Sequence, residues 1–544
     1  MSWENVLRKE ILMLVFILLI PTFDSCQTDE VTVLISDSPA SFLPYLHQVR
    51  EGRCRFILTQ NAEKVKNIME NMNMSFKILR ESPGDDFLRA MDPHDLAYAL
   101  LLASGLERVD ASELPLLRDR ARELEKEISQ RRSDVSVVFF SSDGSDYAFL
   151  AAYAAVLKDA KLLDMDRGFD ASLLRGSSTV IVVTRPLWAN NSVRYERMME
   201  HFTKIDEDPY LDVSFGILTG NSIETPFLML MSDEILRRIP PARFVGISII
   251  EDLPLAWKVE RVASMMGLPT EVYHPDLSHS NMTEDAVSSI LSSGRGIFYL
   301  SLHGNPSVMA LRSDGYVLLG ASTVRRLDIF GSMIITLSCS TLKFSEMESP
   351  NGSIAYAFLD SGALAYVGST RVEFSVGSEF GTSYPDLLLS LLMNGTSLGE
   401  AVKIVNNLKI GDSGGRRDSA SEVLLGDPTL RIGPGRLPFR VSGRGGRYII
   451  EINGATPTLF LRVREEGVPS VTSGVPGLHV KWYGDEEGIF IYITTLSTSY
   501  AGYFESGDSV KVEMRKPIAE IGIIPYFLLM ITVAISLIQL VRRR

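Results

Sequence analysis

Short apolar runs that alternate with longer segments of helical periodicity occupy the middle of this 544-residue chain. From Val135 onward, strand-like runs such as VSVVFF and TVIVVT are each followed by a segment in which apolar residues recur at helical spacing. Buried parallel strands read as continuous apolar runs, and their alternation with helices is typical of a sheet covered on both faces. The pattern therefore predicts an α/β fold with a mostly parallel sheet over residues 133–435.

The regions on either side have a different texture. Residues 27–132 contain two strand-like runs, Val31–Ser36 and Cys54–Thr59, and then a long stretch that reads as helical. Residues 436–516 consist of short alternating segments separated by glycine, proline and aspartate, a pattern typical of a β-sandwich. We expect an N-terminal α/β region before the main sheet and a separate C-terminal β-sandwich after it.

Two strand-like runs in the second half of the α/β block end in chemically reactive residues. Ile297–Leu302 is followed by His303 and Gly304, and Met333–Leu337 leads to Cys339, 36 residues after the histidine (339 − 303). Sheets of this class place their ligands beyond the carboxyl ends of the strands, so the two side chains would face each other over one crevice. A thiol nucleophile needs an imidazole within reach and backbone N–H groups that receive an oxyanion.

This pattern predicts a role for each of the three residues. Cys339 would attack a scissile carbonyl, His303 would act as general base or acid, and the N–H groups of Gly304 and Cys339 would form the oxyanion hole. Glycine at position 304 leaves the approach of the substrate open. Taken singly, the two residues are better explained as a core histidine and an inert buried cysteine. Their place at the ends of adjacent strands favours the catalytic interpretation.

The same stretch carries a family resemblance. The order His-Gly, then strand-Cys, then SPNGSIAYAFLDSGALAYVGST resembles the catalytic region of gingipain-type cysteine peptidases, which are relatives of caspases and legumains. The closing LLGDPTLRI at Leu424–Ile432 is similar to the end of that catalytic domain. The resemblance implies a caspase/gingipain-like fold with a first α/β subdomain at 133–238 and a catalytic subdomain at 239–435. It also implies peptide-bond cleavage through a thioester acyl-enzyme.

The resemblance has consequences for the N-terminal region and for the third member of the site. Residues 27–132 would be a possible pro-region, and QRRSD at Gln130–Asp134 is either an exposed activation loop or an ordinary linker. An acidic residue at the end of an earlier strand would orient His303, and Glu251 and Asp252 are the candidates by position. Either residue serves equally well as an N-cap of the helix that follows.

The resemblance further places the walls of the substrate pocket just after the third strand of the catalytic region. The residues at these positions are Ser369, Thr370, Arg371 and Phe374. The segment STRVEF differs from the residues usual in the family. A preference for arginine or lysine before the scissile bond is therefore not implied.

Composition narrows the classes of partner. The net charge is −13 and no Lys/Arg-rich block interrupts the main body, which disfavours nucleic-acid binding. His274 and His279 lie five residues apart in a proline-containing loop without nearby cysteine, so we expect no metal site and no cofactor. Three cysteines do not form a disulfide framework, and Cys54 in the strand-like RCRFIL is expected to be a buried structural residue.

Both ends of the chain have the pattern of membrane-targeting segments. Residues 1–26 read as a signal peptide, with an uncleaved anchor as the alternative and lipid attachment at Cys26 as a weak further one. Residues 521–541 form an apolar stretch long enough to span a bilayer, and the three arginines of 542–544 would hold that end in the cytoplasm. The sandwich would then be a stalk before the membrane. Five Asn-x-Ser/Thr sequons are compatible with this placement: Asn73, Asn190, Asn281, Asn351 and Asn394.

The sequence thus predicts a cysteine endopeptidase anchored in the cell membrane by one C-terminal helix, with the bulk of the chain extracytoplasmic. Its partner would be a protein or peptide substrate. Two alternatives stay open: a legumain-like transamidase, in which an amine replaces water at the acyl-enzyme, and a catalytically inactive surface binding protein on the same fold.

Overall fold

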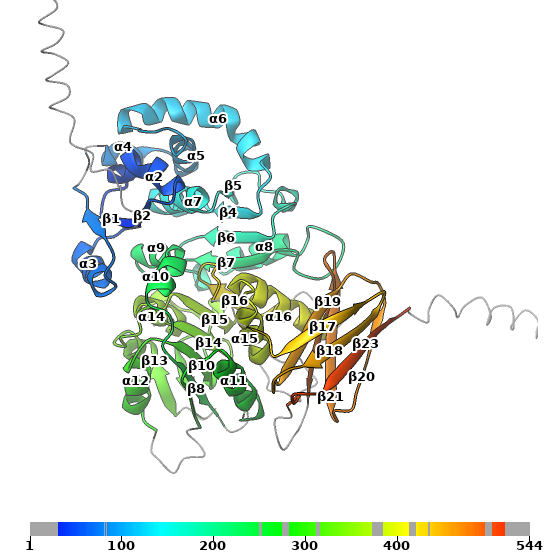
Figure 1. The fold of residues 1–544 in the computed structure, drawn as a ribbon. Coiled ribbons are helices and arrows are strands. Elements are labelled where there is room, and N and C mark those ends of the chain that lie inside the picture. Colours follow the sequence, from blue (N-terminus) through cyan, green and yellow to red (C-terminus); the bar gives the residue numbers. More distant parts are fainter. Residues whose placement is uncertain are drawn as a thin grey trace, which may run out of the picture.

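The architecture is that of a computed structural model centred on a ten-stranded sheet (Figure 1). The structure describes residues 31–80, 82, 84–249, 253–274, 282–311, 316–372, 384–412, 420–432, 436–495 and 503–516. In spatial order the strands of the central sheet are β5 (Lys161–Asp164), β4 (Val135–Phe139), β6 (Thr179–Val183), β7 (Ser214–Leu218), β16 (Glu422–Leu425), β15 (Ala365–Ser369), β14 (Met333–Thr336), β10 (Ile297–Ser301), β8 (Phe244–Ser248) and β9 (Thr270–Tyr273).

The sheet consists of two parallel halves that run in opposite directions. Strands β5, β4, β6 and β7 pair in parallel, and so do β15, β14, β10, β8 and β9. Strand β16 joins the halves, because it is parallel to β7 and antiparallel to β15. The predicted mostly parallel α/β sheet is confirmed, whereas the reversal at β16 was not predicted. As a result, the carboxyl ends of the first-half strands lie at the opposite edge from those of β10 and β14.

Helices between the strands cover the sheet. They are α7 (Ser145–Leu157), α8 (Val193–Phe202), α9 (Glu224–Leu230), α10 (Ser232–Arg238), α11 (Leu253–Met265), α12 (Glu284–Ser292), α13 (Ala321–Val324), α14 (Ile354–Asp360), α15 (Pro385–Met393) and α16 (Leu398–Asp412). Single turns of 3-10 helix are η3 (Ser141–Asp143), η4 (Ala171–Leu174), η5 (Ala189–Asn191), η7 (Phe344–Glu346) and η8 (Pro350–Gly352).

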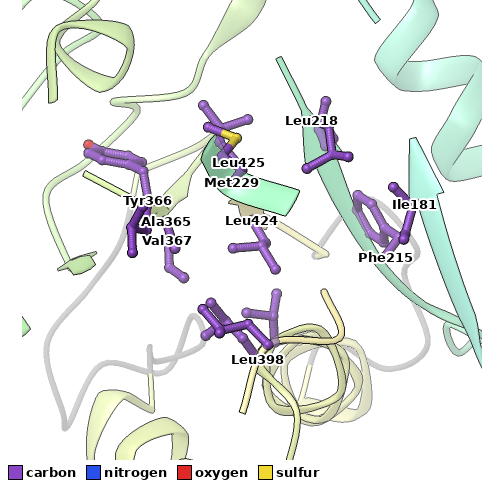
Figure 2. Close-up of a cluster of buried hydrophobic side chains, with 14 of the residues drawn as sticks. Ile181, Phe215, Leu218, Met229, Ala365, Tyr366, Val367, Leu398, Leu424 and Leu425 are labelled. Atoms are coloured by element: carbon purple, nitrogen blue, oxygen red, sulfur yellow. The ribbon is translucent and has the colours of Figure 1, made fainter. Parts of the chain in front are cut away.

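A continuous apolar core crosses the junction of the two halves. Figure 2 shows side chains of β6, β7, β15 and β16 packed together with Leu398 of α16. One partly buried ion pair also crosses this junction: the Lys158 ammonium, at the end of α7, donates to Asp427 Oδ2 at 2.6 Å and to Thr429 Oγ1 at 2.8 Å. Asp427 is fully buried and belongs to the GDPT segment singled out in the sequence. The halves therefore share one core, which stabilises their relative position.

The N-terminal region packs on the first half of the sheet, at the end formed by β4 and β5 (Figure 1). Its three-stranded parallel sheet and helices are β2 (Cys54–Leu58), β1 (Thr32–Ser36), β3 (Phe76–Ile78), η1 (Pro39–Tyr45), α2 (Leu46–Arg50), α3 (Ala62–Asn71), α4 (Asp85–Ala90), α5 (Pro93–Ala103), η2 (Ala111–Glu113) and α6 (Leu114–Gln130). The ring of Phe56 stacks on the ring of Tyr153 of α7, with 5.2 Å between the ring centroids. The backbone N–H of Phe56 donates to the Tyr153 hydroxyl at 3.1 Å. This contact lies in the buried core, so the region is integrated with the first half.

The C-terminal region is the predicted β-sandwich. One sheet contains β17 (Phe439–Arg444), β18 (Arg447–Ile452), β23 (Ser509–Arg515) and β20 (Val468–Ser473), and the other contains β19 (Thr458–Val463), β22 (Gly488–Thr495) and β21 (Leu478–Asp485). All neighbouring strands are antiparallel. Strand β20, with the sequence VPSVTS, carries few apolar residues, so its sequence alone gives little indication of a strand.

The sandwich is docked on the second half of the main sheet, beside α15 and α16, and does not extend away from it as a free stalk (Figure 1). The buried Lys258 ammonium of α11 donates to Thr494 Oγ1 at 2.7 Å. The buried Asp386 carboxylate of α15 accepts from Thr458 Oγ1 at 2.6 Å and from the Tyr492 hydroxyl at 3.0 Å. Because buried polar groups are costly without partners, these bonds fix the contact between the two domains.

Both predicted targeting segments, residues 1–26 and 521–541, lie outside the described residues. Among the helices of the described ranges, none combines the length and the apolar character needed to cross a bilayer. Membrane anchoring therefore stays a prediction from the sequence.

Candidate functional site

His303 and Cys339 lie at the same level beyond two adjacent parallel strands. Each residue of β10 lies opposite the residue 36 positions later in β14, the same spacing that separates the histidine from the cysteine. The alignment continues past the strand ends, where the Leu302 N–H donates to Ser338 Oγ at 3.2 Å. His303 and Cys339 are the next residues on each side. Strands β10 and β14 therefore bring His303 and Cys339 to the same edge of the sheet.

Gly304 packs directly against the peptide that carries the cysteine. A Cβ at Gly304 would lie 2.9 Å from the carbonyl oxygen of Cys339, 2.9 Å from Ser338 Cβ and 3.2 Å from Thr341 Cγ2. A side chain at position 304 would have to displace the residues around the thiol. The sequence explained this glycine by open access for a substrate, and the structure adds a requirement for close packing.

The chain turns sharply immediately after Cys339. Ser340 has a φ angle of 53°, in the left-handed region that non-glycine residues rarely adopt. Its N–H donates to the carbonyl oxygen of Arg371 at 2.7 Å, which compensates for the strain. Cys339 itself is half-buried. Strained backbone of this kind is typical of functional sites, and here it projects the cysteine from the end of β14.

Cys54 is the buried structural cysteine that the sequence predicted. Its side chain is fully buried in β2, and Sγ donates to Gln48 Oε1 at 3.2 Å. Neither Cys54 nor Cys339 is part of a disulfide. The thiol at the sheet edge is therefore the one that a substrate can reach.

The segment after the histidine forms a small antiparallel sheet. His303 and Gly304 (β11) pair with β12 (Val308–Ala310), which pairs in turn with β13 (Val317–Gly320). The segment between the two reactive residues therefore contains an antiparallel strand pair, and residues 312–315 between its strands lie outside the described residues. The pairing fixes the backbone of His303, whose ring is half-buried.

The orientation of His303 by an acidic residue stays a prediction. Strand β8 leads toward this site, since Ser248 pairs with Ser301 and the Ile249 N–H donates to the Ser301 carbonyl at 3.0 Å. Glu251 and Asp252 come next, but both lie outside the described residues. Within the described part of the chain, the imidazole of His303 has no hydrogen-bond partner.

The residues predicted to wall the substrate pocket differ in accessibility. Ser369 is fully buried, and its Oγ accepts from the Arg371 N–H at 3.1 Å. Thr370 is half-buried, and its N–H donates to the Ser421 carbonyl at 2.9 Å. The side chain of Arg371 is exposed next to the turn after Cys339, and Phe374 lies outside the described residues. Of the described three, Arg371 is the most exposed.

Ser338 has a supporting role that the sequence analysis did not assign. Its side chain is fully buried, accepts from the Leu302 N–H and donates to the Leu300 carbonyl at 3.4 Å. It thereby links the segment before His303 to the segment before Cys339. The sequence shows that a serine comes immediately before the cysteine. Its burial and its hydrogen-bond partners are visible only in the paired strands.

One group of carboxylates in the described part of the chain has the proximity needed for a metal ion. Asp206, Asp208 and Asp212 bring oxygen atoms within 4.8 Å of one another in the loop after α8. Burial and the neighbouring carboxylates raise the pKa of Asp208 and of Asp212 to about 6. The group belongs to the first half of the molecule, where no residue of the candidate site lies.

The match with a known family covers this site. Residues 253–433 match the family model of Peptidase family C25. The chain carries a Peptidase family C25 domain. This C25 domain includes His303, Gly304 and Cys339, and it makes the protein a cysteine-type peptidase by family. The resemblance to gingipain-type peptidases is thereby confirmed for this segment, whereas the role of each residue is not tested by it.

Among curated proteins, none matches this chain. Solved structures similar to the chain include the Arg-specific cysteine proteinase gingipain R (RGPB), at 11% identity and a TM-score of 0.39 over 72% of this chain and 93% of the other. A complex of the pro- and mature domains of RgpB from Porphyromonas gingivalis matches at 10% identity and a TM-score of 0.37, over 90% of this chain and 95% of the other. A structure described as a protease matches at 9% identity and a TM-score of 0.38, over 90% of this chain and 98% of the other.

Proposed function

We propose that the protein is a cysteine endopeptidase that cleaves peptide bonds with Cys339 as nucleophile and His303 as its acid–base partner. The observation that carries this proposal is the alignment of β10 and β14. It brings the two residues to one level at the edge of the sheet, with Gly304 packed against the Cys339 carbonyl. The C25 domain supports the reaction class.

Each group has one task in the proposed reaction. The Cys339 thiolate, stabilised by the imidazolium of His303, attacks the scissile carbonyl. The oxyanion that forms accepts hydrogen bonds from the backbone N–H groups of Gly304 and Cys339. His303 protonates the leaving amine as the C–N bond breaks, which leaves a thioester on Cys339. Water activated by His303 then attacks the thioester and regenerates the thiol.

Iodoacetamide labelling and peptide cleavage together test this assignment. At mildly acidic pH the reagent should modify Cys339 faster than an ordinary thiol, because the imidazolium keeps sulfur in its nucleophilic form. Replacing His303→Ala should slow this labelling to the rate of an ordinary thiol. Replacing Cys339→Ala should abolish cleavage of a proteome-derived peptide mixture and leave the thermal unfolding midpoint unchanged. Persistent cleavage in Cys339→Ala would eliminate the nucleophile, and slow labelling of Cys339 in the unmodified protein would favour the inactive binding protein.

We also propose that the peptidase acts outside the cytoplasm, tethered to the membrane by residues 521–541. Four of the sequon asparagines lie in the described part of the chain, and all four are exposed, which supports a compartment where glycosylation occurs. They are Asn73, Asn190, Asn351 and Asn394. Protease added to intact cells should remove the domains described here while the last residues remain protected. Full protection of these domains would contradict this placement.

A further inference from the structure

A cavity of about 410 Å³ opens beside the residues that follow His303. One wall is formed by residues 305–308, which run from the end of β11 to the start of β12. The other is formed by residues 346–349 together with Gly352, which follow Cys339 in the sequence. One wall thus follows His303 in the sequence, and the other follows Cys339. Both walls of the cavity are therefore continuations of the segments that carry the candidate active-site residues.

The first wall is a rigid turn. The Asn305 N–H donates to the Val308 carbonyl at 3.1 Å, and Asn305 Oδ1 accepts from the N–H groups of Ser307 and Val308 at 2.8 and 3.1 Å. Asn305 is two residues beyond His303, which places the start of this wall roughly 7 Å along the strand from the histidine. That distance matches the spacing of one or two residues of an extended substrate.

The second wall is held to its surroundings by backbone bonds. The carbonyl oxygen of the buried Met347 accepts from the Ala189 N–H at 3.0 Å. The Ile354 N–H, at the start of α14, donates to the Pro306 carbonyl of the first wall at 2.8 Å. The cavity is therefore built from backbone that is fixed on both sides, as a preformed binding site requires.

The direction of the substrate follows from the proposed reaction. His303 delivers its proton to the leaving amine, so the part of the substrate after the scissile bond must run alongside His303. The turn at 305–308 follows His303 and Gly304 directly and forms the first wall of the cavity. The cavity therefore lies next to the substrate residues on the carboxyl-terminal side of the scissile bond.

The charge of the cavity is negative. Both of its ionisable lining residues are glutamates, Glu346 and Glu348, and both are exposed to solvent. Glu346 pairs at 2.5 Å with Lys343, which does not line the cavity. Among the described residues, Glu348 makes no ion pair. Arg325, which donates to the Asn351 carbonyl, does not line the cavity and pairs with Asp360 at 3.2 Å.

We propose that this cavity binds a lysine or arginine side chain of the substrate, one or two residues after the scissile bond. The inference rests on the proposed peptidase function and specifies the substrate class for that site. A substrate ammonium or guanidinium in the cavity would be attracted by the Glu348 carboxylate and by the Glu346 carboxylate, which also pairs with Lys343. No cation among the described lining residues would repel it. A substrate glutamate in the same place would be repelled by both carboxylates.

The test compares peptides that differ only at the positions after the scissile bond. Sequences cleaved by the full chain are first identified in a proteome-derived peptide mixture. Peptides with lysine, glutamine or glutamate at each of the two positions are then synthesised. At the substrate position that binds in the cavity, we expect kcat/KM for the lysine peptide to exceed that for the glutamine peptide about three- to tenfold. This is the effect expected from two partly solvated ion pairs. Because the pairs are exposed, higher ionic strength should reduce this ratio.

Substitution of the two lining glutamates checks where the preference originates. The double variant Glu346→Gln and Glu348→Gln should bring the lysine-to-glutamine ratio close to one. The control is Glu127→Gln on the exposed surface of α6, which removes one carboxylate far from the site and should keep the ratio of the unmodified protein.

Three results distinguish failure of this inference from failure of the proposed function. Cys339-dependent cleavage with equal rates for lysine and glutamine overturns the basic preference and leaves the peptidase intact. A lysine preference that survives in the double variant assigns recognition to another surface and overturns the role of the cavity. Absence of any cleavage by the unmodified protein overturns the proposed function and, with it, this inference.

Discussion

Replacing Gly304 by alanine is the sharpest test of how the candidate site is assembled. The added methyl carbon would lie 2.9 Å from the Cys339 carbonyl oxygen, 2.9 Å from Ser338 Cβ and 3.2 Å from Thr341 Cγ2. Ordinary contacts between nonbonded atoms of this size are about 3.5 Å, so the atoms must separate by about 0.6 Å. The backbone of Gly304 is not in the left-handed region, so the effect is purely one of packing.

The residues on either side of Cys339 are held by hydrogen bonds, so they cannot move away from Gly304 without displacing the cysteine. Ser338 Oγ is tied to the Leu302 N–H, and the Ser340 N–H is tied to the Arg371 carbonyl, so the cysteine is held from both sides. Relief of the overlap must therefore shift the thiol relative to His303. Overpacking of this kind costs about 1–3 kcal/mol of stability. A misplacement approaching 1 Å costs about 100-fold in rate, so we expect kcat/KM to fall about 10- to 100-fold.

The assay is steady-state cleavage of a peptide identified with the unmodified protein, together with thermal denaturation. Gly474→Ala is the matched control, because a Cβ at Gly474 has no neighbour within 4 Å and its φ lies outside the left-handed region. We expect the control to keep the activity and stability of the unmodified protein. Undiminished kcat/KM in Gly304→Ala would refute the reasoning, since the thiol would then tolerate a displacement that the proposed geometry forbids.

Three further predictions address the support of the site and the docking of its neighbours. Ser338→Ala removes a buried hydrogen bond between the ends of β10 and β14 and should cost about 1–2 kcal/mol of unfolding free energy, measured in urea, together with part of the activity. Lys158→Met leaves the fully buried Asp427 without its cation and should cost about 3 kcal/mol in the same experiment; a loss below about 1 kcal/mol would show that the pair does not link the halves. Burial opposes protonation of His94, but the hydrogen bond to Asp164 at 2.9 Å and neighbouring carboxylates raise its pKa overall. The stability from this pair is therefore complete at mildly acidic pH and lost as the pH rises through the raised pKa, so the stability difference between the unmodified protein and His94→Gln should shrink from acidic to alkaline pH. A constant difference would contradict the charge-dependent contact.

Local pattern was sufficient for most strands and failed where burial depended on a distant partner. Strand β5 begins with Lys161, whose buried ammonium donates to the Leu173 carbonyl, so its charge interrupted the apolar run that predicts a strand. Strand β16 begins with Glu422, which is buried because Lys409 of α16 neutralises it at 2.9 Å. Neither partner can be inferred from the neighbouring sequence. Strands such as β10 and β14 were predictable because their own side chains supply the burial.

The sequence by itself determined that His303 and Cys339 end successive buried strands, because a continuous apolar run followed by polar residues has few other structural solutions. Only the tertiary structure decided that the two residues lie level, since that depends on the register between β10 and β14. It also decided that the two halves of the sheet run in opposite directions and that Glu346 and Glu348 meet the turn after His303 in one cavity. The physical reason is the same in each case. Strand formation is driven by the burial of a segment's own side chains, whereas register, strand direction and the convergence of loops depend on contacts between residues far apart in the chain.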